Sequence, residues 1–199
     1  MTTNIKVFLL ETTDTERREL RRYATGPCSC KNYPASYHDA SVALDIAPYD
    51  KSERHWPRDD PRWPRFCECG YEFEPEDPWQ LFTRRLYVRA DTGEQLTLNE
   101  APVGACWFAE WYAEHPAYRG SDGRTLVVMT PGGEWIVDSR ASNCTRPNDN
   151  EHKCWVRHGR PEDGSLHVDK NGLTCEAGAG SIVCGAYHGF LHNGHLTNC

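Results

Sequence analysis

The sequence predicts an α+β fold that is mostly β, built from short antiparallel strands and hairpins with little helix. Short apolar or alternating runs are separated by glycine, proline and aspartate turn signals along most of the chain, a pattern typical of β-rich proteins. Only one stretch has the composition of a helix. Because 38% of the 199 residues are hydrophobic, the core is modest, and aromatic side chains must supply much of its buried area.

The N-terminal part of the chain contains two expected strands and the one expected helix. Ile5 to Leu10 is a short apolar run, and Ser41 to Ile46 alternates apolar residues with small or polar ones, which is the strand period. Between them, Thr15 to Tyr23 (TERRELRRY) has helix-forming residues after a Thr/Asp capping stretch. We therefore predict a short helix that ends before Gly26-Pro27.

A long irregular loop is expected at about 48–66, within a single domain that spans 1–199. Its part around HWPRDDPRWPR combines prolines with charges and with Trp56 and Trp63, so regular structure is not expected there. Two interpretations stay open. The tryptophans either bind a partner, or pack back onto the body of the protein, since exposed tryptophan is uncommon.

From Phe82 onward the sequence predicts two hairpins and further short strands. Phe82 to Arg89 and Gln95 to Leu98 flank the turn ADTG, and Leu126 to Thr130 and Trp135 to Asp138 flank PGG. The aromatic run Trp107 to Tyr112 fits a buried helical turn or a strand. Three further short strands are expected at 154–157, 166–168 and 181–184.

Paired cysteines predict a metal site. Cys28 and Cys30 form one C-x-C pair, and Cys67 and Cys69 form another. Two cysteine pairs separated by a long insertion assemble many structural zinc sites, although the common pair is C-x-x-C. Four thiolates select zinc over calcium or magnesium, and zinc would help to stabilise a modest core. His38 could replace one sulfur, and the alternative is that these are thiols without metal.

A second group of candidate ligands lies between Ser139 and His195, which holds four of the ten cysteines and six of the nine histidines. One interpretation joins three cysteines with one unspecified histidine in a second zinc site. Another joins a C-x3-H pair to Cys67 and Cys69 as a Cys3His site. The third is that Cys144 and Cys175 are core thiols. The three cysteines of the second site are Cys144, Cys154 and Cys175, and the C-x3-H pair is Cys184 with His188.

Charge and motifs limit the function classes. A formal net charge of −7 argues against a protein that coats nucleic acid. No apolar run approaches the ~18 residues of a membrane span, and the N-terminus lacks a signal-peptide pattern, so we expect no membrane partner and a reducing cytoplasmic location. No familiar catalytic motif is present. Two alternatives remain: a metal-dependent enzyme using a Cys/His site in 139–195, and a nucleic-acid-binding module using the arginines and tryptophans of 54–65.

Several blocks of the sequence carry a resemblance. The strings SRASNCT, HKCWVRHG and YHGFLHNG, with longer blocks at 69–73, 77–112, 130–159 and 168–194, resemble a family of uncharacterised proteins of tailed bacteriophages and prophages. The resemblance covers most of the chain after Pro27, and no activity comes with it. The tail also resembles small bacterial domains that end in a Cys/His pair after a C-x-C-G knuckle, which favours Cys184 and His188 as ligands.

These observations together predict a zinc-binding, phage-encoded accessory protein that is not an enzyme and acts by binding. The metal would be structural. The expected partner is a protein, either of the host, for a host-takeover or anti-defence factor, or of the virion, for an accessory component. The expected location is accordingly the host cytoplasm or the virion. Nucleic acid is a less favoured partner.

Overall fold

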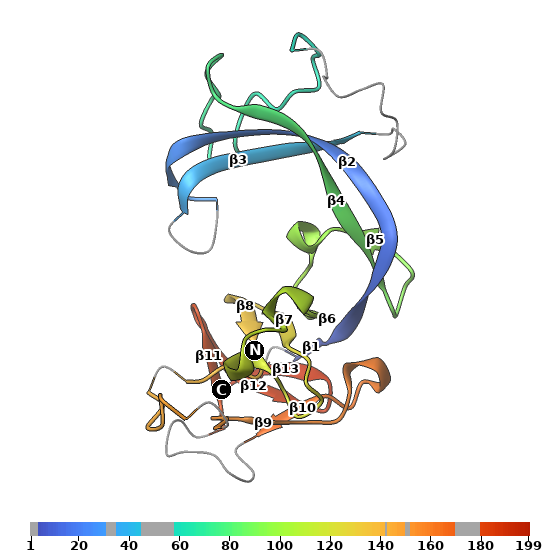
Figure 1. The fold of residues 1–199 in the computed structure, drawn as a ribbon, viewed down its shortest axis with the longest axis vertical. Coiled ribbons are helices and arrows are strands. Elements are labelled where there is room, and N and C mark those ends of the chain that lie inside the picture. The colour runs from blue at the N-terminus through green and yellow to red at the C-terminus, as the bar shows by residue number, and fades with distance from the viewer. Residues whose placement is uncertain (1–3, 31–34, 45–57, 142, 150–151, 170–179) are drawn as a thin grey trace. The chain divides into compact units, whose positions relative to one another are not determined.

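The computed structural model describes residues 4–30, 35–44, 58–141, 143–149, 152–169 and 180–199. Within these ranges the chain forms strands and four short 3-10 helices, and no α-helix (Figure 1). The strands are β1 (Asn4–Lys6), β2 (Phe8–Cys28), β3 (Ala35–Leu44), β4 (Trp79–Arg89), β5 (Gln95–Leu96), β6 (Ala105–Phe108), β7 (Leu126–Thr130), β8 (Gly133–Ile136), β9 (Val156–His158), β10 (His167–Asp169), β11 (Ile182–Cys184), β12 (Tyr187–His192) and β13 (His195–Asn198). The 3-10 helices are η2 (Leu98–Glu100), η3 (Glu110–Tyr112), η4 (Pro116–Tyr118) and η5 (Pro161–Asp163). The prediction of a mostly β fold with little helix is confirmed.

The chain divides into two compact units. The large unit comprises Met1–Glu11 with Val88–Cys199, and the small unit comprises Thr12–Tyr87. Strands β2 and β4 each run through the border between the units without interruption. The single domain expected from the sequence therefore stays a prediction, and each unit is described by itself below.

The large unit is organised by antiparallel hairpins around one core. Strands β1, β13, β12 and β11 form a sheet in that order, and β6, β7 and β8 are neighbours in a second sheet. The turn between β12 and β13 is Asn193-Gly194, in which both residues have positive φ (47° and 70°), as a type I′ hairpin turn requires. The predicted β7–β8 and β4–β5 hairpins are confirmed. The core of the large unit contains, among others, Trp135, Trp155, Leu126, Leu166 and Leu196.

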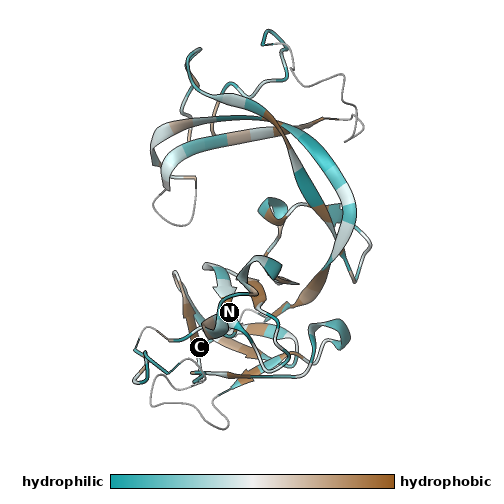
Figure 2. Cartoon of the chain, in the orientation of Figure 1, coloured by the Kyte–Doolittle hydropathy of each residue, from teal (hydrophilic) through white to brown (hydrophobic). Residues whose placement is uncertain are grey.

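The small unit has much less apolar packing. Strand β2 pairs antiparallel with β3 from Arg18↔Leu44 to Cys28↔Ala35. One apolar cluster joins Leu20, Leu44 and Trp63, and another joins Ala24 and Phe73 to the buried cysteines Cys28 and Cys67. Figure 2 shows hydrophilic colouring along much of β2 after its apolar start. A unit with so little apolar core needs an additional source of stability.

The helix predicted at Thr15 to Tyr23 is wrong, because the whole stretch belongs to β2. Its charged side chains find partners that a strand provides. Arg17 reaches Glu19 two residues along the same face at 2.8 Å, and Arg84 from β4 reaches the other oxygen of Glu19 at 2.9 Å. Side chains two apart share a face in a strand but not in a helix. Long-range pairing therefore overrides the local helix propensity.

The structure describes only the later part of the expected irregular loop, and 45–57, with Trp56, lies outside the described residues. From Arg58 to Arg65 the chain forms turns without strands. Trp63 is buried and lies with its ring 5.0 Å from that of Trp79, so it packs onto the small unit. Arg58 stacks over Trp79 with its guanidinium carbon 4.5 Å from the ring centroid. These residues serve the fold of the small unit.

Candidate metal centre

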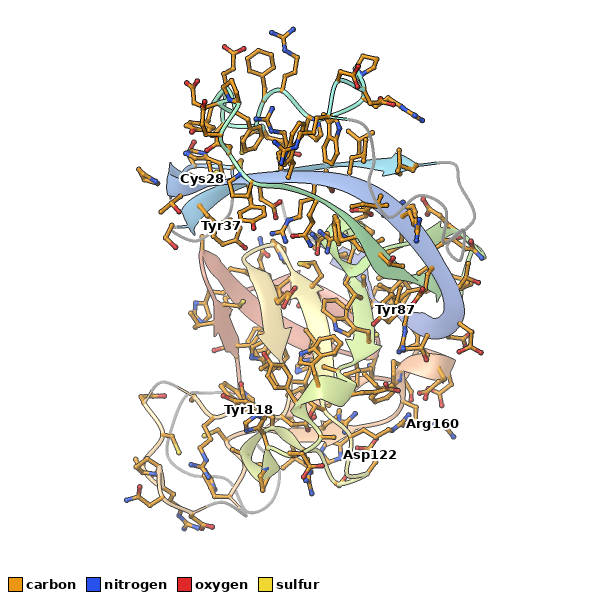
Figure 3. The ribbon with its side chains drawn as sticks, turned by 45° about the horizontal axis from the view of Figure 1, so that its top comes forward. Cys28, Tyr37, Tyr87, Tyr118, Asp122 and Arg160 are labelled. Carbon is orange, nitrogen blue, oxygen red and sulfur yellow. The ribbon has the colours of Figure 1, made fainter. Side chains whose placement is uncertain are left out.

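The structure brings Cys28, Cys30, Cys67 and Cys69 together in the small unit, as predicted. Each offers one sulfur, and all four sulfurs lie within 4.8 Å of one another. Cys28 is the last residue of β2, next to the start of β3 (Figure 3). The β2–β3 register shifts between Thr25 and Cys28, which marks a bulge, and bulges commonly redirect side chains next to functional sites.

The spacing of the sulfurs is close to that of a tetrahedral metal site. The Sγ atom of Cys67 lies 3.7 Å from that of Cys28 and 3.4 Å from that of Cys30. Zn–S bonds of ~2.3 Å in a regular tetrahedron put sulfurs about 3.8 Å apart. Cys28 and Cys30 are closer, at 2.7 Å between sulfurs, and neither is in a disulfide. The group could therefore hold a metal ion after a small spreading of this pair.

A tight turn from Phe66 to Glu72 presents the second cysteine pair. Phe66 and Glu72 form an isolated antiparallel bridge, and inside it the amide of Cys67 donates to the carbonyl of Tyr71 at 2.9 Å. The amide of Gly70 donates to the carbonyl of Cys67, also at 2.9 Å. Gly70 has φ +91°, a conformation that L side chains rarely adopt. The glycine after the second cysteine thus allows both sulfurs to face the same point.

The thiols of Cys67 and Cys30 differ in acidity. Burial by itself raises the pKa of the Cys67 thiol, but backbone hydrogen bonds at Cys69 and Asp39 outweigh it and lower that pKa to about 6. The hydrogen bond with Cys28, together with burial, raises the pKa of Cys30 to about 12. Close thiols resist sharing several negative charges because like charges repel. A bound divalent cation removes that repulsion and deprotonates the coordinating thiols.

His38 lies beside the four sulfurs without joining them as a fifth ligand. It is buried, and its Nδ1 lies 3.2 Å from the Sγ of Cys69. Its ring stacks on Tyr71 at 4.0 Å between centroids, with planes only 5° apart. A Cβ on Gly26 would come within 3.1 Å of its Nε2, so the glycine leaves room for the ring. With four cysteines present, His38 is better placed to donate a hydrogen bond to a sulfur than to replace one.

We expect His38→Ala to weaken metal binding without abolishing it. The variant loses the hydrogen bond to Cys69 and the stacking on Tyr71, and removal of such supporting partners typically costs about 10–100-fold in metal affinity. Competition with a chromophoric chelator measures the change. Phe66→Ala is the matched control, because Phe66 lies next to Cys67 but is 53% exposed. Equal metal affinity in the His38 variant and the control would contradict this role of the imidazole.

The second group of predicted ligands is brought together in part. Cys144, His152 and Cys154, all in the large unit, offer ligand atoms within 4.8 Å of one another. Cys154 and His152 are buried, and Cys144 is half-buried. Cys175 lies outside the described residues. The structure thus forms a Cys/His/Cys group that includes His152. The sequence had not singled out His152 among the six histidines between Ser139 and His195.

Cys184 and His188 are not brought together, which corrects their assignment to a shared site. In the β11–β12 hairpin Cys184 is opposite Tyr187, and His188 is opposite Val183. Adjacent cross-strand pairs point to opposite faces of a sheet, so the C-x3-H spacing separates the two side chains. His188 instead lies 3.0 Å from the hydroxyl of Ser181, and the thiol of Cys184 lies 3.4 Å from the carbonyl of Glu134.

The arginines proposed for nucleic-acid binding, as far as the structure describes them, contact other residues of the protein. Arg62 pairs with Asp60 at 3.0 Å, and Arg65 pairs with Glu72 at 3.4 Å. Arg54 lies outside the described residues.

Comparison with protein-family models, with curated proteins and with solved structures finds no match for this chain. None of the helices in the described ranges is long and apolar enough to cross a membrane. The chemistry of the side chains is therefore the basis for a functional assignment.

Proposed function

We propose that the small unit is built around a structural zinc ion held by Cys28, Cys30, Cys67 and Cys69. The main observation behind this proposal is that four sulfurs from two distant chain segments lie close together. Four thiolates favour zinc over hard cations such as magnesium and calcium. The four protein ligands leave no open coordination position, which is the mark of a structural rather than a catalytic zinc site.

We further infer that the protein is a phage-encoded accessory protein that acts by binding another protein. The resemblance of its sequence blocks to phage and prophage proteins supports the origin. Support for a binding role comes from the metal knuckle, the turn from Phe66 to Glu72, where Phe66 is 53% exposed although its backbone is bridged to Glu72. Arg65 lies over the ring of Phe66, with its guanidinium carbon 5.7 Å from the centroid. Exposed aromatic and arginine side chains are the residues most enriched in protein interfaces.

Metal analysis of the purified chain tests the structural part of this proposal. We expect zinc to co-purify without added metal and to be lost from the small unit only on denaturation or prolonged chelation. Elemental analysis together with native mass spectrometry gives the stoichiometry. A folded protein that contains no zinc would overturn the proposal.

The binding role needs a separate experiment. Mass spectrometry of purified virions shows whether the chain is a virion component, and affinity capture from infected cells, compared between the natural chain and Phe66→Ser, identifies a host partner. We expect one specific partner to be lost with the serine variant while zinc content is unchanged. A partner retained equally by both chains would exclude the knuckle as the interface. The alternative of a metal-dependent enzyme stays a hypothesis.

A further inference from the structure

We propose that Cys144, His152 and Cys154 bind a second metal ion of the zinc class, in the large unit and independent of the four-cysteine centre. The three residues come from the segment between β8 and β9, which has turns but no strand or helix in its described part. Their ligand atoms lie within 4.8 Å of one another. The Nε2 of His152 is 3.5 Å from the Sγ of Cys154.

Burial of these polar side chains costs free energy when no metal is bound. His152 is only 4% exposed, and its Nδ1 has no hydrogen-bond partner among the described residues. Cys154 is fully buried within the apolar core of the large unit, against which Cys144 also packs. Buried polar atoms in proteins nearly always have a partner, so a buried imidazole with an unpartnered nitrogen is costly. A metal bond to the imidazole would offset its loss of hydration.

Charge favours the same occupant. A divalent ion with two thiolates and one neutral imidazole carries no net charge, so it suits an apolar site far better than an isolated thiolate would. On binding, the two thiols release their protons to solvent. The amide of Arg146 lies 3.4 Å from the Sγ of Cys144 and points its N–H at the sulfur, as in metal knuckles. Two sulfurs and one nitrogen select zinc-like ions over calcium or magnesium.

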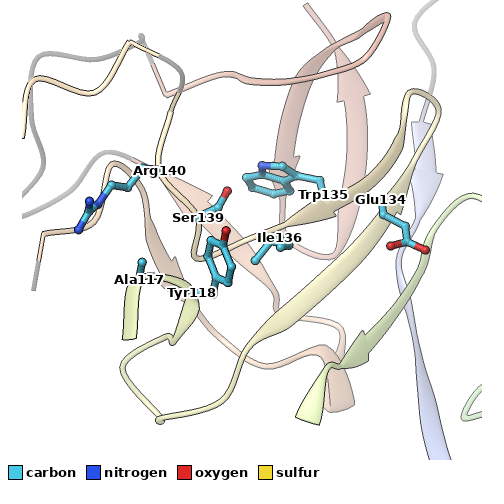
Figure 4. A pocket seen from close by; sticks show the side chains of 7 residues that line it. All are labelled: Ala117, Tyr118, Glu134, Trp135, Ile136, Ser139 and Arg140. Atoms are coloured by element: carbon cyan, nitrogen blue, oxygen red, sulfur yellow. The ribbon is translucent and has the colours of Figure 1, made fainter. Parts of the chain in front are cut away.

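Arg140 and the metal would stabilise different parts of this segment. Arg140 donates from its guanidinium to the carbonyls of Pro147 and Asp149, so it holds the part around these two residues. Arg140 also lines a cavity of about 510 Å³ beside Trp135, and its guanidinium points away from that ring (Figure 4). The metal would link Cys144 to the 152–154 stretch. The irregular segment between β8 and β9 would then be held by Arg140 and by the metal.

Cadmium-113 NMR of the natural chain tests the proposal without any substitution. Protein loaded with this isotope is expected to show two resonances, one typical of four sulfurs and one, at higher field, typical of two sulfurs with nitrogen. Native mass spectrometry is expected to show two metal ions per chain. A single resonance and one ion, with the protein folded, would overturn the second site.

Substitutions then assign each resonance. His152→Cys keeps a ligand but changes its atom, so the high-field resonance is expected to move downfield while the other stays in place. A histidine with only a packing role would leave both unchanged. His188→Ala is the matched control and should leave both resonances intact. Cys67→Ser should remove only the four-sulfur resonance, so failure of the four-cysteine centre and failure of this site give different spectra.

Discussion

Replacement of Cys67 by serine is expected to unfold the small unit while the large unit stays folded. The thiol is 2% exposed and lies within 3.7 Å of two other sulfurs, so the variant loses both a ligand and part of a small core. Binding of a structural zinc contributes on the order of 10 kcal/mol in small zinc-dependent peptides, and that binding energy is folding energy. Cys69→Ser should behave in the same way.

Thermal unfolding and tryptophan fluorescence measure this effect, because Trp63 and Trp79 report on the small unit. Cys199→Ser is the matched control, since Cys199 is exposed at the end of the chain. We expect Cys199→Ser to have the same melting temperature as the natural protein. Cys67→Ser and Cys69→Ser should lose the fluorescence transition that reports unfolding of the small unit. Equal melting temperatures for all three variants would show that the knuckle is not a metal site.

Replacement of Gly132 by alanine is expected to destabilise the large unit strongly. A Cβ at this position would lie 1.7 Å from the carbonyl oxygen of Cys184 and 2.9 Å from the amide nitrogen of Tyr187. Both atoms belong to backbone, so the turn between β7 and β8 would have to move away from the β11–β12 hairpin. Overpacking commonly costs about 1–3 kcal/mol and more where the backbone is displaced, so we expect a loss above about 3 kcal/mol.

The neighbouring Gly133 provides the control for this prediction. It has φ +119°, but a Cβ there would meet no atom within 4 Å. Gly133→Ala therefore tests backbone strain alone, at roughly 1–3 kcal/mol. Chemical denaturation of the two variants measures the difference. If Gly132→Ala were as stable as Gly133→Ala, the close approach of the two hairpins would be disproved.

Local signals were sufficient for much of the β structure. The predicted hairpins β4–β5 and β7–β8 each turn at a glycine with positive φ, Gly93 and Gly133, and a turn signal of this kind involves only a few adjacent residues. The same locality explains the aromatic run at 107–112, which continues strand β6 into η3. Local signals failed at Thr15 to Tyr23, because partners of its charges, such as Asp39 and Arg84, are distant in the sequence.

The candidate metal centre shows the same division. Ligand type alone predicted that Cys28, Cys30, Cys67 and Cys69 would meet, since soft thiolates in pairs have few other uses in a reducing compartment. The sequence also named His38 as a candidate ligand, but its contact with Cys69 and its stacking on Tyr71 were seen only in the tertiary structure. It also offered six histidines between Ser139 and His195, and their spacing favoured His188 over His152.

By itself the sequence determined the β-rich class, the β4–β5 and β7–β8 hairpins and the chemistry of the cysteine pairs, because turn conformation and ligand softness are properties of a few adjacent residues. Only the tertiary structure decided that TERRELRRY is a strand, that Cys184 and His188 point apart, and that His152 reaches Cys154. Each of these depends on the register of a strand or on burial among residues far away in the chain. A shift of one residue in a sheet reverses the face of a side chain, and spacing in the sequence cannot reveal that face until the partner strand is known.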